Sequence, residues 1–418
     1  MKILFVLECA NRPTNGTTAT CIRFAKELEK KGHEVTIIGC TQTEEDRYHR
    51  YVSLPKYHFP IFDKLILKEG FVFVRLDDKV IYDAVKGMDV VHLFLPFKLQ
   101  NRVRLIAQEL GVAVTAAFHM LPHNVTSAIH LGKIGLINNV MFYSFRKFIY
   151  DYVHYVHCPS QMTANELKRH HYKRNEFRVI SNGVIPFFKR MDVEKPKIYH
   201  GKFLITMSGR LADEKRQDLI IKAVAKSKYN EKIQIILCGQ GPNKKKYLRL
   251  AKKRKLANPL QIRFCDANEL RDILSYVDLY IHASDFEIEG ISAIEAITCG
   301  AVPLISNHRL CATKDFSIDD EHCLFKHGSV KDLARKIDWF IEHPEEVERL
   351  REAYMKDSKK YALSYQVDEM ERMFKDAIEE KKSGKDIPTL YPRRKDKYFT
   401  KRIHRRLKKS SSNDEDIK

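Results

Sequence analysis

Two glutamates that lie eight residues apart, Glu287 and Glu295, have the clearest chemical arrangement in this sequence. The apolar run 277–281 before them predicts a buried strand, a short helix is predicted over 292–298, and a second strand over 301–305. Ligands of parallel sheets bind outside the carboxyl ends of the strands, so Glu287 would lie at the binding edge and Glu295 on the following helix. The free N–H groups at such a helix start favour an anionic ligand such as a phosphate.

The residues around the two glutamates distinguish two interpretations. Ser292 and Glu295 also fit a capping box, which would make the second glutamate an ordinary helix-start residue. However, the flanking EG, EA and CGAVP resemble the E-x7-E region of retaining, nucleotide-sugar-dependent glycosyltransferases of the GT-B fold, in particular family 4. The resemblance implies that Glu287 lies beside the donor sugar and that Glu295 binds the nucleotide ribose.

A second motif, SGRLADEK, follows a predicted strand over 203–207 and contains Arg210 and Lys215. The resemblance implies that both cations bind the donor diphosphate. Two fixed cations at a glycine turn can stabilise the charge of a leaving pyrophosphate without a metal ion. An exposed position on the helix surface is the alternative for Lys215.

The resemblance also assigns donor contacts to Gly239 and Gly241 of a Gly-Gln-Gly-Pro loop and to Asp266, near the nucleotide base. The same Gly-Gln-Gly-Pro sequence is also a good turn. In the first loop the family often has a Gly-Gly pair near the diphosphate, where this chain has Asn15 and Gly16. That loop lacks the G-x-G-x-x-G fingerprint of dinucleotide sites, and a simple turn is the alternative for Gly16.

A histidine at the end of the predicted strand 113–119 is the remaining candidate. GT-B enzymes place such a histidine against the donor sugar, which implies this role for His119. His123 is a nearby alternative, and a purely structural histidine is the other interpretation.

The sequence has 418 residues, 44% of them hydrophobic, which suits two well-packed domains. Its net charge of +20 predicts an anionic partner such as a membrane surface, a nucleic acid or a phosphorylated ligand. No apolar run approaches the roughly 20 residues that span a bilayer, and MKILFVLE is too short and too soon polar for a signal peptide.

The cysteines and acids give no indication of a metal or disulfide site. Nine cysteines are scattered without CxxC pairs, which is typical of a reduced cytoplasmic protein. The adjacent acids Asp77 and Asp78 lack further ligands and suit a turn. We therefore expect no cofactor and no essential metal.

Strands and helices alternate in both halves of the sequence, which predicts two Rossmann-like α/β domains. With the resemblance, the expected fold is GT-B, with the two domains facing across a cleft. We expect an acceptor domain over 1–184, a nucleotide-sugar donor domain over 185–366, a helix over 367–384 that crosses back to the first domain, and a basic tail over 385–418.

The tail is the most basic segment, because residues 393–409 contain ten Lys/Arg and one Asp. Phe399, Ile403 and Leu407 recur every four residues, as in a helix that lies on anionic lipid. A solvated tail is the alternative. Nucleic-acid binding is third, because no RNA- or DNA-binding motif is visible. The apolar and basic segment 48–78 suits either membrane or acceptor contact or a local core.

The sequence thus predicts a retaining glycosyltransferase that moves a hexose from a nucleotide diphosphate sugar, such as UDP-glucose, to a membrane acceptor such as diacylglycerol or a lipid-linked saccharide. We expect it to be cytoplasmic, with peripheral attachment to the inner face of the membrane. The alternatives are a soluble or surface-polysaccharide acceptor, a GT-B sugar-phosphate epimerase, and a non-catalytic basic scaffold or nucleic-acid-binding protein.

Overall fold

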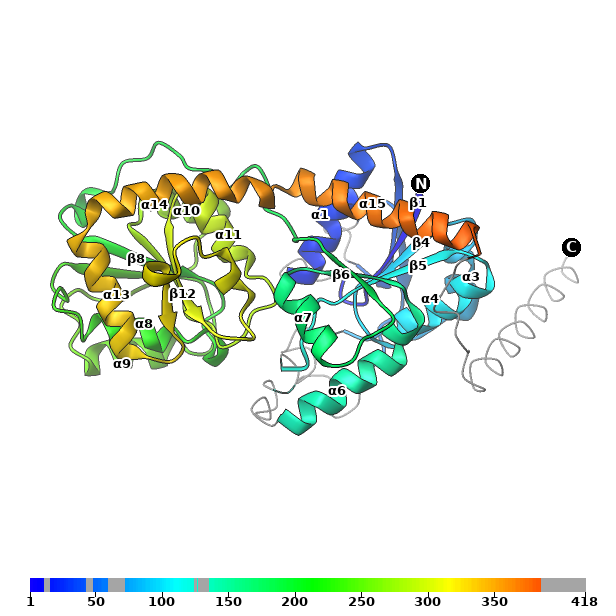
Figure 1. The fold of residues 1–418 in the computed structure, drawn as a ribbon, viewed down its shortest axis with the longest axis horizontal. Coiled ribbons are helices and arrows are strands. Elements are labelled where there is room, and N and C mark those ends of the chain that lie inside the picture. The colour runs from blue at the N-terminus through cyan, green and yellow to red at the C-terminus, as the bar shows by residue number, and fades with distance from the viewer. Residues whose placement is uncertain (11–15, 43–47, 59–71, 124–125, 127–134, 385–418) are drawn as a thin grey trace, which may run out of the picture. The chain divides into compact units, whose positions relative to one another are not determined.

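The structure is a computed structural model that describes all residues except 11–15, 43–47, 59–71, 124–125, 127–134 and 385–418 (Figure 1). The chain forms two compact units, each built on one sheet. Unit 1 comprises 1–159, 163–180 and the chain from Val367 onward, and unit 2 comprises 160–162 and 181–366. The predicted tail segment 393–409 and much of the segment 48–78 lie outside the described residues.

Unit 1 has a seven-stranded parallel sheet in the order β3-β2-β1-β4-β5-β6-β7. Its central strands are almost continuously apolar, as expected when both faces of a parallel sheet are covered by helices. The strands are β1 (Lys2–Val6), β2 (Glu34–Cys40), β3 (Tyr51–Leu54), β4 (Val90–Leu93), β5 (Ala113–Ala117), β6 (Tyr155–Cys158) and β7 (Glu176–Val179). The helices are α1 (Gly16–Lys30), α3 (Asp78–Val85), α4 (Lys98–Glu109), α6 (Gly135–Phe148), η1 (Tyr150–Tyr152) and α7 (Gln161–Arg169).

Unit 2 has a six-stranded parallel sheet in the order β10-β9-β8-β11-β12-β13. Its strands are β8 (Phe203–Ser208), β9 (Ile233–Cys238), β10 (Gln261–Arg263), β11 (Leu279–His282), β12 (Val302–Asn307) and β13 (Leu324–Lys326). Its α-helices are α8 (Gln217–Val224), α9 (Lys244–Lys253), α10 (Ala267–Tyr276), α11 (Ile291–Thr298), α12 (Asp320–Cys323), α13 (Val330–Glu342) and α14 (Pro344–Asp357). Short 3-10 turns are η2 (Lys197–Tyr199), η3 (Asp213–Lys215), η4 (Ala312–Phe316) and η5 (Ser358–Tyr361).

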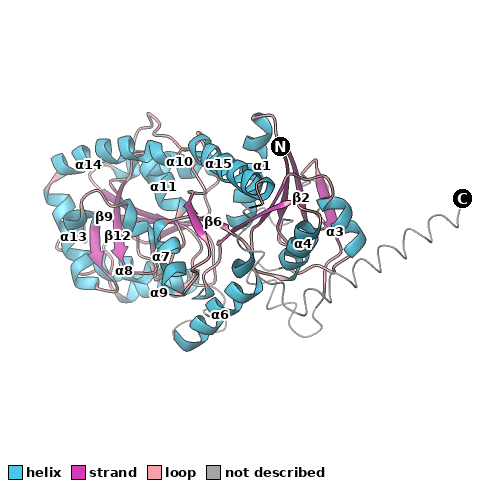
Figure 2. Cartoon of the chain, turned by 45° about the vertical axis from the view of Figure 1, so that its right-hand side comes forward, coloured by secondary structure: helices cyan, strands magenta, loops and turns pink. Residues whose placement is uncertain are grey.

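Helices lie on both faces of the second sheet (Figures 1 and 2). Helices α8, α9 and α13 pack together, and α10, α11 and α14 form the other packed group. The buried core between sheet and helices is aliphatic, with Leu204, Ile235, Leu279 and Leu304 almost inaccessible to solvent. Hydrophobic burial on two faces thus leaves the strand ends and their loops as the places for polar chemistry.

The last helix, α15 (Leu363–Lys382), returns to unit 1, as the sequence predicted. The ring of Phe374 packs edge-on against Phe5 of β1. At its far end, the carboxylate of Glu380 lies 2.7 Å from Nδ1 of His154. The two predicted Rossmann-like α/β units and the returning helix are therefore confirmed. Among the described residues, no helix is long and apolar enough to cross a membrane.

Two local predictions need correction. The strand predicted over 113–119 ends at Ala117, so His119 lies in the loop after β5 rather than in the strand. The carboxylate of Asp77 is not in a simple turn, because it accepts hydrogen bonds from the N–H groups of Lys79 and Val80 and caps helix α3.

Gly39 in β2 lies in a tightly packed part of unit 1, against Leu7 and Tyr51. A Cβ atom at this position would lie 2.2 Å from the carbonyl oxygen of Leu7 and 2.6 Å from the hydroxyl of Tyr51. We expect Gly39→Ala to lower the free energy of unfolding by about 1–3 kcal/mol, measured by urea titration with circular dichroism. The control is Gly135→Ala at the exposed start of α6, where a Cβ would meet no described atom within 4 Å. Equal urea midpoints for the two variants would contradict this prediction.

Candidate functional site

The loops that follow β8 and β11 meet at the carboxyl edge of the second sheet, because these two strands are neighbours. Nζ of Lys215, in η3, donates a hydrogen bond to the carboxylate of Glu287, in the loop after β11. Both side chains are about four-fifths buried. A backbone hydrogen bond of 2.8 Å from Asp285 N to Glu214 O joins the same two loops. Tertiary structure thus brings together two of the predicted site residues, from loops 72 residues apart.

The electrostatics of this pair keep both groups charged. Burial by itself raises the pKa of Glu287, but the Lys215 cation and the ring of His282, 3.4 Å away, outweigh burial and lower it to about 2. Burial likewise tends to lower the pKa of Lys215, and the Glu287 carboxylate reverses this effect and raises it. Burial lowers the pKa of His282, so its imidazole is neutral at pH 7. The site therefore contains a buried ion pair beside a neutral imidazole.

The backbone of the Glu287 loop is fixed on both sides. Glu287 N donates to Leu310 O at 2.9 Å, and Ala312 N donates to Glu287 O at 2.8 Å. Gly290 is the N-cap of α11 with φ +86°, and a Cβ there would lie 2.2 Å from the methyl carbon of Thr313. Only glycine therefore suits this turn between Glu287 and the helix.

Helix α11 begins at Ile291, which decides between the two interpretations of Ser292 and Glu295. Because Gly290 occupies the N-cap and makes no side-chain cap, Ser292 does not form the capping box. Its hydroxyl instead pairs with the Tyr280 hydroxyl at 3.1 Å. Glu295 lies half-buried in the middle of the helix.

Arg210, in the loop after β8, is accessible to solvent. Its side chain is 50% exposed, and Nη2 lies 3.7 Å from the carboxylate of Glu214. The nearby Arg216, which the sequence analysis did not select, is held by two carboxylates. It donates to Asp285 at 2.8 Å and to Asp218 at 3.1 Å. In the sequence, the acidic residues at nearby turns, Asp218 and Asp285, were the signal that could have identified Arg216 as a paired cation.

The predicted glycines 239 and 241 have a visible packing role. A Cβ on Gly239 would lie 2.0 Å from Gly209 O, and one on Gly241 would lie 2.4 Å from Leu211 O. Backbone hydrogen bonds join the two loops at Gly209 N→Cys238 O, 2.9 Å, and Leu211 N→Gln240 O, 2.8 Å. The absence of side chains at these glycines therefore lets their loop pack against the loop that carries Arg210. Their contact with the donor stays a prediction.

Asp266 also has a local task, since its carboxylate accepts from Glu269 N at 2.9 Å and caps helix α10. Gly16 is the first residue of α1 in unit 1. A Cβ there would meet no described atom within 4 Å. Neither observation tests the donor contacts predicted for these two residues.

His119 lies in unit 1 within an aromatic cluster. Its ring stacks on Phe94 at 5.5 Å between centroids and meets the His157 ring edge-on at 4.9 Å. Burial, assisted by neighbouring His157 and His92, lowers the pKa of His119 well below its usual value, so the ring is neutral. Its Nε2 atom has no hydrogen-bond partner among the described residues. The alternative, His123, is half-buried, 6.4 Å from the ring of Phe142.

Glu8 of unit 1 is a buried acid that the sequence analysis did not select. Glu8 lies two residues after the end of β1, is almost fully buried and accepts a hydrogen bond of 2.6 Å from Gln100. Burial raises the pKa of Glu8 to about 7, despite the lowering effect of Gln100. An acid directly after an apolar run was the signal that could have identified it.

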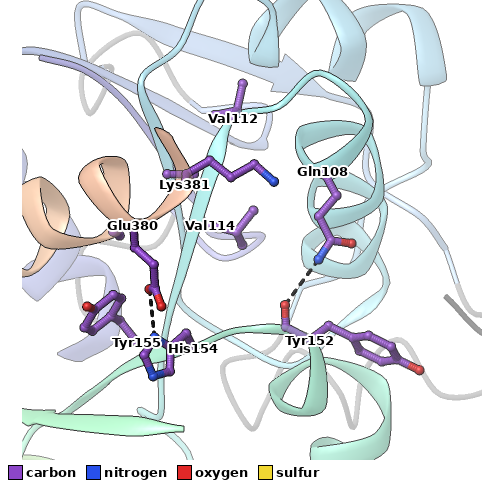
Figure 3. A pocket seen from close by; sticks show the side chains of 10 residues that line it. Gln108, Val112, Val114, Tyr152, His154, Tyr155, Glu380 and Lys381 are labelled. Carbon is purple, nitrogen blue, oxygen red and sulfur yellow. Dashed lines mark hydrogen bonds and ion pairs between the residues drawn. The ribbon is translucent and has the colours of Figure 1, made fainter. Parts of the chain in front are cut away.

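Unit 1 contains a small pocket (Figure 3). Residues of α4, β5, η1, β6 and α15 line it. They include the Glu380–His154 contact and a hydrogen bond of 3.2 Å from Gln108 to Tyr152 O. None of the predicted site residues lines it. Among the described residues, no group of three or more His, Cys, Asp or Glu is arranged to bind a metal.

Removing one member of the Lys215–Glu287 pair should destabilise unit 2 by about 3 kcal/mol, because it leaves an uncompensated buried charge. We expect Glu287→Gln and Lys215→Met each to lower the urea midpoint. The fluorescence of Trp339, the only tryptophan and a residue of α13, reports on this unit. The double variant should recover most of the loss. Additive losses would show that the two charges do not stabilise each other.

The same pair predicts a pH dependence. The pKa of Glu287 is about 2 in the folded chain against a usual 4.5, so the stability gained from ionised Glu287 is complete above pH 4.5. It is lost as the pH falls toward 2. We expect the difference in unfolding free energy between wild type and Glu287→Gln to stay constant from pH 7 to about 5 and to shrink below that. A difference that persists unchanged at pH 3 would contradict the assignment.

Comparisons with known proteins agree with this architecture. The family model described as glycosyl transferases group 1 matches residues 188–357, and the model described as glycosyltransferase family 4 matches residues 14–186. The chain is 26% identical to an alpha-monoglucosyldiacylglycerol synthase of Streptococcus pneumoniae over 318 residues, which cover 71% of this chain and 68% of the synthase.

Solved structures with low identity share the fold. A glycosyltransferase from Rickettsia africae has a TM-score of 0.70 and 17% identity, with 90% of this chain and 98% of that chain covered. HepE from Anabaena, solved in complex with UDP-glucose, has a TM-score of 0.69 and 15% identity, with 90% and 100% covered. From its two matched family models and its two parallel-sheet units, the chain belongs to the group 1 glycosyltransferases of the GT-B fold and is an enzyme of that class.

Proposed function

We propose that this glycosyltransferase moves a glucosyl group, with retention, from UDP-glucose to a lipid acceptor of the diacylglycerol type. The observation that carries the donor half of the proposal is the buried Lys215–Glu287 ion pair, with the accessible Arg210 in the same loop. Cations and an ionised carboxylate at one strand edge match the two chemical parts of a nucleotide diphosphate sugar.

The roles follow from the charges of these groups. Arg210 and Lys215 would offset the charge that develops on the departing diphosphate, which is the task that a metal ion performs in other enzymes. Glu287 stays ionised at neutral pH because of Lys215, so its carboxylate can accept hydrogen bonds from sugar hydroxyls. Glu295 is proposed to bind the ribose. We assign no nucleophile, and no metal or cofactor is needed for these roles.

The remaining predicted contacts, those of His119 and of four residues near the nucleotide, belong to the same proposal. The neutral imidazole of His119 has a free Nε2 within the described part of the chain, so it can exchange a hydrogen bond with a sugar hydroxyl. Gly16, Gly239, Gly241 and Asp266 are proposed to approach the nucleotide and its phosphates. The uridine and glucose identities are supported by the UDP-glucose complex of the structurally similar HepE.

The proposed lipid acceptor is supported by a related protein and by the charge of the chain. The related S. pneumoniae protein is named as a synthase of a glucosylated diacylglycerol. A net charge of +20 suits work at an anionic lipid surface. We accordingly propose peripheral attachment to such a surface, with the tail segment 393–409 as one contributor.

The test is transfer by the purified protein from a panel of UDP- and GDP-sugars, with and without vesicles of anionic lipid and diacylglycerol. We expect a glucolipid with UDP-glucose, and a fall in kcat of about 10²–10³-fold in Arg210→Ala, because one charge-stabilising donor is lost. Glu287→Ala should abolish the product. Arg249→Ala, an exposed cation on α9, is the matched control and should be unchanged.

Other results would redirect the proposal. Turnover of the nucleotide sugar without a lipid product would overturn the lipid acceptor and favour a soluble or polysaccharide acceptor. Full activity in Glu287→Ala would overturn the assigned site.

A further inference from the structure

The loop between β11 and α11 carries a second buried glutamate whose partners differ from those of Glu287. Glu289 is 3% exposed, and its carboxylate accepts hydrogen bonds from the Ser181 hydroxyl and from Asn182. The Asn182 backbone N lies 3.0 and 3.1 Å from its two oxygens, and Nδ2 of the Asn182 side chain lies 2.5 Å from one of them. Glu287 is thus held by a cation, whereas Glu289 is held by neutral donors.

The partners of Glu289 are themselves fixed. Ser181 N donates to Oε1 of Gln366 at 2.8 Å, and Gly183 N donates to Oγ of Ser181 at 3.0 Å. A Cβ on Gly183 would lie 2.8 Å from Cα of Leu363, so this turn packs directly against the start of α15. The residue before Glu289 is anchored too, because Oγ of Ser160 donates to Ile288 O at 2.6 Å. The loop is therefore attached to the turn 181–183 and to Ser160, through residues that do not contact Lys215 in any of these hydrogen bonds.

This arrangement costs stability, which suggests another reason for its presence. Among the described residues no cation pairs with Glu289, and burying a carboxyl group without a counter-ion is unfavourable. Glu289 lies two residues after Glu287 and directly before the helix-capping Gly290. Together with the backbone hydrogen bonds of Glu287 to Leu310 and Ala312, its attachment therefore helps to fix where Glu287 and the start of α11 lie.

We propose that Glu289 is a positioning residue of the donor site, whose carboxylate, held by Ser181 and Asn182, fixes the loop that presents Glu287 to the donor sugar. This inference rests on the proposed function for the role of Glu287. It assigns Glu289 no contact with the substrate.

The charge state of Glu289 gives the proposal a distinctive signature. Burial raises the pKa of Glu289 to about 7, although Ser181 and Asn182 act to lower it. The other titratable groups around it change charge elsewhere: Glu287 has a pKa of about 2, the pKa of His282 is below 6.5, and burial raises the pKa of Tyr361. Only ionised Glu289 can accept from all of its donors at once.

The first experiment compares the pH–rate profiles of wild type and Glu289→Gln in the full-length protein. In wild type we expect kcat for glucosyl transfer to rise as the pH increases through about 7. Glu289→Gln, a neutral isostere of the protonated acid, should lack this rise and stay about tenfold to a hundredfold below the wild-type plateau, with KM for UDP-glucose changed less than about threefold. Glu352→Gln, exposed on α14, is the matched control. An unchanged rise near pH 7 in Glu289→Gln would overturn the proposal.

The second experiment exchanges the two partners. Asn182→Asp places a second carboxylate against Glu289 and should lower kcat more than about tenfold. Combining it with Glu289→Gln restores an amide–carboxylate pair with donor and acceptor reversed, and kcat should recover to within about threefold of wild type. A double variant no better than the worse single variant would count against positioning through this contact.

Two further measurements distinguish a wrong role for Glu289 from a wrong proposed function: calorimetry of nucleotide-sugar binding and urea unfolding at several pH values. If wild type binds no nucleotide sugar in calorimetry, the proposed function is wrong. The placement of Glu289 is then judged by unfolding alone. A raised pKa means that ionisation opposes folding, so the wild-type urea midpoint should fall more between about pH 5 and 8 than that of Glu289→Gln, in which Glu8 is the remaining buried acid with a pKa of about 7. Parallel pH dependences of the two midpoints would overturn the placement.

Discussion

A buried charge must be paired, and the second unit of this protein is arranged around that requirement. Lys215 and Glu287 come from loops that follow β8 and β11, and each needs the other to remain ionised away from water. The sheet order makes the contact available because β8 and β11 are neighbours. The pair therefore joins two β–α connections into one site and supplies both a cation and an anion at the strand edge.

Glycine makes the close approach of these connections feasible. Gly239 and Gly241 lie against the backbone of the loop that carries Arg210, at distances where a Cβ would overlap carbonyl oxygens. Gly290 permits the sharp turn that starts α11 beside Thr313. The geometry of the charged groups thus depends on backbone packing at positions that carry no functional side chain.

Glu287 and Glu289, the two glutamates of the β11–α11 loop, have different pKa values because their surroundings differ. Glu287, beside a cation, is ionised at any physiological pH, whereas Glu289, among neutral donors, has a pKa of about 7. Both are buried, so the difference arises from their partners rather than from exposure. One carboxylate suits contact with a ligand and the other suits attachment of the loop.

The sequence by itself determined the alternation of strands and helices, the two units and the residue types of the site. The helix after Glu287 begins within one residue of its predicted start, because apolar periodicity and glycine turns are local properties. The family resemblance of their motifs selected Arg210, Lys215 and Glu287 as site residues, and their roles stay predictions.

Only the tertiary structure decided which of these residues are partners. Lys215 and Glu287 are 72 residues apart, and Asn182 and Glu289 are 107 apart, so no local pattern could pair them. Their contacts depend on sheet order and on where the chain crosses between elements. The same holds for His119, whose neutral state comes from burial and from His157 and His92, which the neighbouring strands β6 and β4 supply. Sequence patterns specify local structure, whereas pKa values and contacts depend on packing between segments that are distant in the chain.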